Sequence, residues 1–155
     1  MIEDDIKKLN ELAESFRRLK NKFILLQLIK QAQSEYDRYD YEAARKTLLQ
    51  AYRMDKTNAS TLRGLGCIKQ FKGNYNAAVY YFKKALACSE KKEVEYTLIG
   101  MAYYFQDKLD DAVKYFNLAI NENDSYDSAY EGRNQAMLEN RLKLIDIQES
   151  LKKHF

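Results

Sequence analysis

The chain has 155 residues, of which 46% are apolar, and this size suits one continuous core but is short for two. Its 26 basic and 23 acidic side chains nearly cancel to a net charge of +3, so the sequence does not favour a nucleic acid as partner. It contains no proline, no alternating run typical of a strand and no apolar run as long as a membrane span. We therefore expect an all-α fold.

Residues 1–24 are predicted to form an N-terminal helix with one apolar face. Steps of three and four residues, with one of seven, separate the members of this face, which are Ile2, Ile6, Leu9, Ala13, Phe16 and Phe23. No helix breaker follows, so the helix is free to continue into the next segment. Three uses of the apolar face remain open: it caps the open end of the core, pairs with a second copy of the chain or, less favoured, lies on a membrane surface.

A regular interval organises the middle of the chain, where Ala44, Ala78 and Ala112 are evenly spaced. Each is preceded by a small residue and followed by a bulky apolar residue and another alanine, which gives the sets Ala32, Gly66 and Gly100, then Leu48, Phe82 and Phe116, then Ala51, Ala85 and Ala119. A fixed period of about 34 residues indicates a repeat protein, in which neighbouring units stack to bury a common core.

The period has a geometric reason in a pair of antiparallel helices. A small residue on the first helix, such as Gly66, is expected to face a small residue on the second, such as Ala78, so that the two backbones approach closely. Large residues such as Phe82 then fill the space around this contact. Polar loops separate the units, and inter-helix turns are predicted near residues 38–41, 72–75 and 106–109.

These residues resemble the tetratricopeptide repeat, a helix-turn-helix unit of about 34 residues. The third unit carries the family pattern best, in Tyr96, Ile99, Gly100, Tyr103, Ala112, Phe116 and Ala119. The second unit follows the pattern except that Lys69 stands at an aromatic position. The first matches in its second half only, because Gln31 and Glu35 replace an apolar pair. The family's proline is absent from every unit.

The resemblance implies a single domain, a right-handed superhelical solenoid of antiparallel helix hairpins. Its parts are an N-terminal helix at 1–24, three repeats at 25–58, 59–92 and 93–126, and a C-terminal capping helix at 127–155. The apolar stripe of that last helix is expected to be Met137, Leu142, Ile145 and Leu151.

Catalytic chemistry has little support in the sequence. The one histidine, His154, lies next to the C-terminus, so no base is available for a nucleophile inside a cleft. No metal-ligand spacing is present, and Gly64-x-Gly66 lies in a predicted helix, where it indicates packing and not phosphate binding. We expect neither an enzyme nor a cofactor.

The two cysteines fall on different helices of one predicted hairpin. Cys67 lies mid-way along the first helix and Cys88 near the end of the second, too far apart for a disulfide. Free thiols and the acidic start of the chain, which is unlike a secretory signal, predict a cytoplasmic protein.

The remaining function is protein binding. The family binds ligands on the concave face formed by its first helices, and the resemblance places that face at Ile29, Gln33, Tyr36, Arg63, Cys67, Gln70, Phe71, Thr97, Met101, Tyr104, Phe105, Glu131 and Gln135. This face is rich in aromatic and sulfur-bearing side chains, which accept apolar surfaces of varied shape. For any one of Phe71, Tyr104 and Phe105, a place in the core between repeats is an equally good interpretation. The family's lysine and asparagine clamp for a terminal carboxylate is absent at these positions.

The leading hypothesis is therefore an adaptor or chaperone that holds a partner segment with apolar anchors in an aromatic groove. Within it, Arg63 and Glu131 are expected to orient the partner from the rim. A first alternative is a secretion-type chaperone for hydrophobic export substrates. Such chaperones resemble this chain in its size and in having three repeats behind an N-terminal helix. A second is a structural subunit that self-assembles, for example as a homodimer, through its terminal helices.

Overall fold

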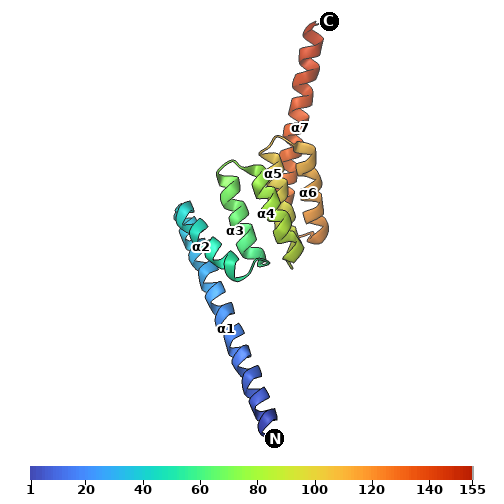
Figure 1. The fold of residues 1–155 in the computed structure, drawn as a ribbon. Helices are drawn as coiled ribbons and strands as arrows, with labels where there is room; N and C mark the ends of the chain where they lie inside the picture. The colour runs from blue at the N-terminus through green and yellow to red at the C-terminus, as the bar shows by residue number, and fades with distance from the viewer. Residues whose placement is uncertain (155) are drawn as a thin grey trace.

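The computed structural model describes residues 1–154, which form seven α-helices and no strand. The helices are α1 (Ile2–Asp37), α2 (Tyr41–Met54), α3 (Ala59–Phe71), α4 (Tyr75–Cys88), α5 (Lys92–Tyr104), α6 (Leu109–Glu122) and α7 (Asp127–His154). The C-terminal third of α1 pairs with α2, α3 with α4, and α5 with α6, and the three hairpins stack side by side (Figure 1). The predicted all-α solenoid of helix hairpins is confirmed.

One turn geometry recurs in all three hairpins. Tyr39, Gly73 and Asp107, which are one period apart, have φ of 64°, 74° and 63°. The amide of the following residue donates to a carbonyl five residues back, in the pairs Asp40 to Glu35, Asn74 to Lys69 and Lys108 to Tyr103. A left-handed residue with this hydrogen bond ends a helix and reverses the chain. All three turns lie where the repeat predicts them.

Side-chain caps start three of the helices without proline. Asp40 accepts a hydrogen bond from the amide of Ala43 at the start of α2, and Asn74 from the amide of Ala77 at the start of α4. Asn58 does the same for Thr61 at the start of α3. Each cap satisfies an amide that has no partner within the helix, so polar residues of the loops mark where these helices begin.

The repeat alanines form the centre of the core, but the glycines contact a different group from the one expected. Ala44, Ala78 and Ala112 are fully buried. A Cβ atom on Gly66 would lie 2.5 Å from the ring of Phe82, and one on Gly100 2.9 Å from the ring of Phe116. The nearest group to each glycine is therefore the aromatic ring of the paired helix and not the alanine. Glycine is required because the ring lies against its backbone.

The first hairpin achieves the same packing with other residues. Glu35, which stands at an apolar position of the repeat, is buried, and its carboxylate accepts hydrogen bonds from Gln31 at 2.8 Å and Thr47 at 2.7 Å. These donors satisfy both carboxylate oxygens, so a buried acid is tolerated where the pattern is weakest. The first half of this unit is therefore helical despite its poor match to the repeat.

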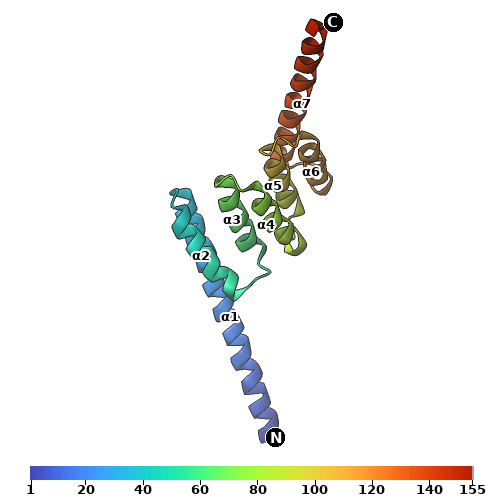
Figure 2. The same ribbon diagram turned by 45° about the horizontal axis from the view of Figure 1, so that its top comes forward.

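Both terminal helices extend beyond the stacked hairpins (Figures 1 and 2). Residues 1–24 continue α1 without a break and are all exposed, so their apolar face does not cap the core. In α7, Ala129 and Ala136 are buried, and the part that contains them packs against α5 and α6. The stripe predicted from Met137 to Leu151 is exposed instead, because α7 has by then left the surface of the last hairpin.

Candidate protein-interaction face

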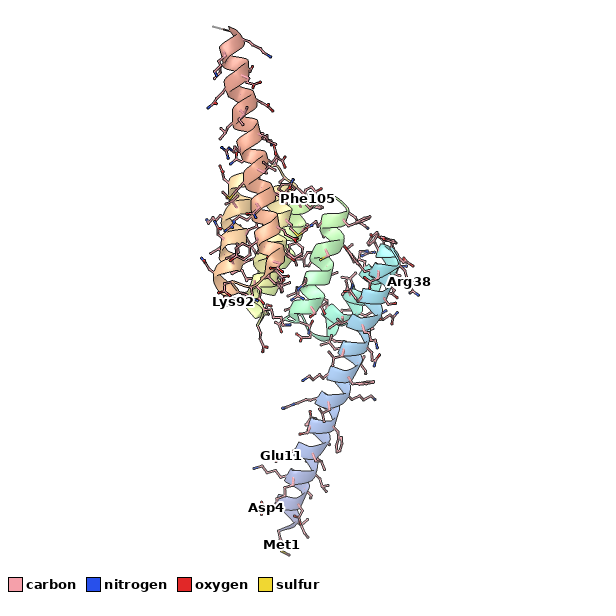
Figure 3. The ribbon with its side chains drawn as sticks, turned by 180° about the vertical axis from the view of Figure 1, so that it is seen from behind. Met1, Asp4, Glu11, Arg38, Lys92 and Phe105 are labelled. Carbon is pink, nitrogen blue, oxygen red and sulfur yellow. The ribbon has the colours of Figure 1, made fainter. Side chains whose placement is uncertain are left out.

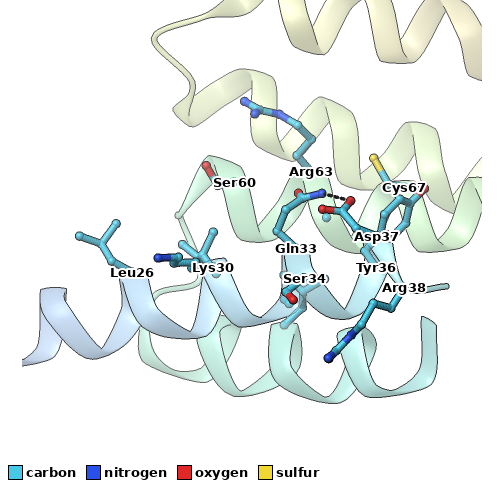
Figure 4. Close-up of a pocket in the computed structure, with 14 residues that line it drawn as sticks. Leu26, Lys30, Gln33, Ser34, Tyr36, Asp37, Arg38, Ser60, Arg63 and Cys67 are labelled. Carbon is cyan, nitrogen blue, oxygen red and sulfur yellow. Dashed lines mark hydrogen bonds between the residues drawn. The ribbon is translucent and has the colours of Figure 1, made fainter. Parts of the chain in front are cut away.

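The predicted binding residues gather around two separate hollows. The larger, of about 740 Å³, lies between α1 and α3 and is bordered on one side by α2. Of the predicted residues it contains Ile29, Gln33, Tyr36, Arg63 and Cys67. Figure 4 shows Gln33 and Tyr36 on α1 facing Arg63 and Cys67 on α3 across this space. Leu26, Ala32 and Leu48 add apolar lining.

Cys67 is a packing residue in the wall of this hollow and not an activated nucleophile. Burial raises the pKa of the Cys67 thiol to about 11, and the nearby Arg63 opposes that rise only in part. The thiol is therefore protonated at neutral pH, when a nucleophile would have to be the thiolate. Burial also raises the pKa of the Tyr36 phenol on the opposite wall. At these two positions the walls of the hollow thus present neutral side chains.

Arg63 is held by a partner that the sequence did not reveal. Its Nη2 donates to Glu95 Oε1 at 2.6 Å, and its Nε lies 3.1 Å from both carboxylate oxygens. Glu95 on α5 is fully buried, whereas the Arg63 side chain keeps 29% of its surface exposed. The hydrogen bond to Glu95 raises the pKa of Arg63, so this guanidinium stays charged. Reversing the charge of Arg63 would leave Glu95 buried without a partner. We therefore expect the main effect to be a loss of stability and not a change in the rate at which a partner binds.

The smaller hollow, of about 160 Å³, lies between α5 and α7 over the ring of Phe116. It brings together Met101, Tyr104, Phe105 and Gln135, all of them predicted from the repeat. Its exposed lining is entirely apolar. A hydrogen bond to Glu139 raises the pKa of Tyr104 above its ordinary value, so this phenol stays protonated and able to donate. The hollow has room for about one apolar side chain.

Two predicted aromatic anchors have structural contacts between hairpins. Phe71 stacks on Tyr41 with ring centres 3.8 Å apart, and Phe105 stacks on Tyr75 at 5.8 Å. The two pairs are one repeat apart, so they are the same contact made twice along the edge of the stack. Phe71 and Phe105 nevertheless remain 58% and 50% exposed. They serve as connectors that still offer an open ring face.

The other predicted residues do not join either hollow. Thr97 is buried and its hydroxyl donates to the carbonyl of Glu93, so it is not available to a partner. The Oε1 atom of Gln70 is buried without a donor among residues 1–154. Glu131 is exposed on α7, outside both hollows. Nine of the predicted residues thus line two pockets, and the Arg63–Glu95 pair joins α3 to α5.

Two residues that shape this face are missing from the sequence prediction. Glu95 fixes Arg63, and its burial had no local signal because its partner is 32 residues away on another helix. Gly132 forms part of the smaller hollow, where its Cβ would lie 2.5 Å from Phe116. Gly132 follows Gly64 by two repeat lengths, and Gly64 packs in the same way against Leu48, so this signal was present in the sequence.

Metal-binding clusters and membrane-spanning helices are both absent from the described residues. Within residues 1–154, no cluster of three or more His, Cys, Asp or Glu side chains is arranged to hold a metal ion. The same part of the chain contains no helix with the length and apolarity needed to cross a membrane. Cys67 and Cys88 are both free thiols, as their predicted separation requires.

Solved structures with the same arrangement of helices are numerous. The second tetratricopeptide repeat domain of human RPAP3, in complex with an HSP70 peptide, superposes with a TM-score of 0.68 at 14% identity, over 76% of this chain and 98% of that one. The Yersinia enterocolitica secretion chaperone SycD, in complex with a peptide of the translocator YopD, gives 0.67 at 19% identity, over 75% and 94%. Pseudomonas aeruginosa pilF gives 0.72 at 18% identity, over 79% and 56%. At these identities the likeness is one of fold.

Sequence comparison identifies the repeat itself. The tetratricopeptide repeat family matches residues 58–92, which contain the second hairpin, and residues 96–126, which contain all of the third except the first turn of α5. No curated protein matches the sequence. The regular period of the sequence, the recurring left-handed turns and these two matches lead to one conclusion: the chain belongs to the tetratricopeptide repeat family.

Proposed function

We propose that this protein is an interaction module that holds an apolar segment of a partner protein across its two hollows, as an adaptor or a chaperone. The observation that carries the proposal is the smaller hollow, where Met101, Tyr104 and Phe105 surround an entirely apolar opening over Phe116. Exposed aromatic and methionine side chains around a preformed opening are typical of the anchor pockets of protein interfaces.

The larger hollow supplies the second contact of the proposed site. Its apolar wall, with Ile29 and Leu48, accepts a further side chain of the segment, and Arg63 keeps part of its guanidinium exposed at the edge. Because Glu95 already neutralises Arg63, the guanidinium contributes orientation through hydrogen bonds more than net charge. Two anchors from one extended segment give specificity for their spacing as well as for their shape.

Peptide complexes of similar folds support this use of the concave face. The human RPAP3 and Yersinia enterocolitica SycD domains carry bound peptides from other proteins. The terminal-carboxylate clamp is absent from the predicted positions, so we propose recognition of an internal apolar segment and not of a free C-terminus. The free thiols of Cys67 and Cys88 and the raised pKa of Cys67 support a non-enzymatic role in a reducing compartment such as the cytoplasm.

The test compares two hollow variants with a matched control. A tagged chain captures partners from the native host, mass spectrometry identifies them, and calorimetry with the purified partner then measures affinity. Met101→Ala and Ile29→Ala are each expected to cost roughly 1 to 4 kcal/mol of binding. Tyr80→Ala removes an exposed aromatic side chain of α4 outside both hollows and should bind at parental strength. Parental affinity in both hollow variants, with circular dichroism unchanged, would refute the proposal.

A second candidate is a secretion-type chaperone. SycD, whose structure includes a translocator peptide, is matched by this chain over 94% of its length, and this likeness of fold supports the second candidate. The same capture distinguishes the two, since this candidate requires the identified partner to be an export substrate whose apolar segment competes for the hollows.

A further inference from the structure

The free part of α1 carries an apolar face that no other residue of the described chain covers. Leu9, Phe16 and Phe23 expose 64%, 64% and 63% of their surfaces, and Leu25 is the first buried residue of the helix. Figure 3 shows this part of α1, from Met1 past Glu11, extending alone from the stacked hairpins. A row of large apolar side chains in water is costly and typical of an interface that is completed by another molecule.

The face has the spacing of a helix-pairing seam. Its positions are Ile2, Ile6, Leu9, Ala13, Phe16, Lys20 and Phe23, in alternating steps of four and three residues. A second row, in steps of seven, runs beside it and consists of Asp5, Leu12 and Leu19. Such a pattern over three heptads is the arrangement by which two helices pack side by side. From Ile2 to Phe23 the face is about 33 Å long, at about 1.5 Å per residue over 22 residues.

Two charges within the seam and its neighbouring row decide the direction of the partner. Asp5 lies at the start of the apolar face and Lys20 close to its end. A second copy of the helix that runs antiparallel brings its Lys20 beside Asp5, and the same contact recurs at the other end. Glu3 and Arg17 on the edge of the face are paired in the same way. A parallel copy would instead align Lys20 with Lys20, which is repulsive.

Side-chain size agrees with the same arrangement. When Ile2 lies opposite Lys20 of the second copy, Ala13 lies opposite its Leu9 and Phe16 opposite its Ile6, so the small residue meets a larger one. A parallel copy would place Ala13 against Ala13 and leave a gap. The antiparallel register also ends at Lys20, before the first buried residue Leu25, so the hairpins of the two copies lie at opposite ends of the paired helices without collision.

Other surfaces fit this face less well. The exposed apolar side chains of α7 lie on two sides of the helix, with Leu138, Leu142 and Ile145 on one and Leu144, Ile147 and Leu151 on the other, so they form no single seam. A membrane surface is disfavoured because acidic and basic side chains nearly cancel over residues 1–24, whereas helices that lie on anionic lipid carry an excess of basic residues.

We propose that residues 2–20 of α1 form an antiparallel two-helix pair with the same residues of a second copy, which makes the protein a homodimer with its two concave faces at opposite ends. The interface uses no residue of either hollow. The dimer and the binding of a partner segment are therefore separate properties, and each can fail without the other.

Light scattering on the full chain tests the dimer. The parent protein is expected to have twice the 18.3 kDa mass of one chain at micromolar concentration. Phe16→Asp should abolish the dimer without unfolding the hairpins, because Phe16 is exposed within one chain. Arg18→Asp places the same residue on the opposite face of the same turn and should leave the dimer intact. A monomeric parent overturns the proposal, and if it also sediments with anionic phosphatidylglycerol vesicles, the face binds a membrane surface instead. A dimer that Phe16→Asp leaves unchanged overturns the proposal as well.

Charge and cross-linking then test the direction. Lys20→Asp should weaken the dimer by roughly tenfold or more, because it places two acids beside each other at both ends. In chains with Cys88→Ser, oxidation of a mixture of Glu3→Cys and Arg17→Cys proteins should link residue 3 of one to residue 17 of the other. Links of residue 3 to residue 3 would overturn the antiparallel arrangement. Partner capture by the hollows should persist in Phe16→Asp, which separates this interface from the proposed function.

Discussion

The junction between the first two hairpins and the junction between the second and third use the same two repeat positions differently. At the second junction these positions hold Arg63 and Glu95, which form a buried ion pair between α3 and α5. At the first junction, one period earlier, these positions hold Ile29 and Thr61. The hydroxyl of Thr61 donates a hydrogen bond to Asn58, the cap of its own helix, and so does not join the two hairpins.

The ion pair at the first junction is of another kind. It joins Lys72, at the end of α3, to Glu42 on α2, and both side chains are exposed to solvent. An exposed pair contributes little to stability, because water screens it and both side chains lose freedom when they pair. The first junction also contains the larger hollow, so its hairpins are held together less tightly at this face.

The hairpins differ in a second pair of positions. Gly66 and Gly100 lie against the rings of Phe82 and Phe116, whereas the first hairpin has Ala32 and Leu48 in their places. A smaller aliphatic side chain on α2 leaves room for the methyl group of alanine on α1. The same repeat therefore forms an interlocked part, in which glycines pack against aromatic rings up to the third hairpin. It also forms a more open part beside the first hairpin, where Ala32 and Leu48 replace them. The larger hollow lies in the more open part, whereas the smaller hollow lies over Phe116 in the interlocked part.

The largest expected effect breaks the interlocked part. Gly66→Leu should destabilise the fold by roughly 3 kcal/mol or more, because its Cβ alone would lie 2.5 Å from Phe82 and the helices would have to separate. Urea denaturation measures the free energy of unfolding. Gly73→Asn is the control, since asparagine tolerates the φ of 74° and nothing lies near that position.

A double-mutant cycle sharpens the same comparison. Gly66→Ala combined with Phe82→Leu reproduces the Ala32 and Leu48 pair of the first hairpin, so the double variant should be more stable than the sum of the two single effects predicts. Strictly additive effects would show that the glycine and the ring are not coupled.

The second prediction removes the ion pair of the closed junction. Glu95→Ala should cost about 2 to 4 kcal/mol of stability, because Arg63 is then left partly buried without its partner. The pair Arg63→Ile and Glu95→Thr, which installs the residues of the first junction, should recover most of this loss. A thermal melt of each variant is the measurement. If the double variant is as unstable as Glu95→Ala, the residues of the first junction cannot replace the ion pair of the second.

The third prediction is a pH dependence localised to the larger hollow. The folded-state pKa of Cys67 is raised to about 11, so the neutral thiol contributes a stability that is complete below pH 9 and is lost as the pH rises from about 9 to 11, where the unfolded chain ionises first. Urea denaturation across this range, in the parent and in Cys67→Ala, should show a steeper fall for the parent. At pH 8 a thiol reagent should modify exposed Cys88 faster than Cys67. Parallel curves and equal reactivity would place Cys67 in water.

The smallest effect concerns the turn of the first hairpin. Tyr39 holds a φ of 64°, which is strained for a bulky residue, while the equivalent position of the second hairpin is Gly73. Tyr39→Gly should therefore stabilise the protein by about 0.5 to 1 kcal/mol, less the contact that Tyr39 makes with Tyr41. Differential scanning calorimetry detects this as a higher melting temperature. A lower one would mean that the aromatic contact outweighs the backbone strain.

The sequence by itself determined the parts of this protein that depend on local geometry. The regular period, the three turns, the small residues of the core and the separation of the two cysteines all follow from spacing, because each repeat solves the same helix-packing problem with residues close to one another in the chain.

Only the tertiary structure decided how those parts meet. Glu95 and Arg63 come from different repeats, and their pairing depends on how one hairpin is rotated against the next, which no local pattern encodes. The fold also decided that predicted binding residues line two hollows and that Thr97 is buried. The ends of α1 and α7 are exposed because each helix is longer than the hairpin it contacts, and the length of a contact is set by the neighbour and not by the apolar pattern of the helix itself.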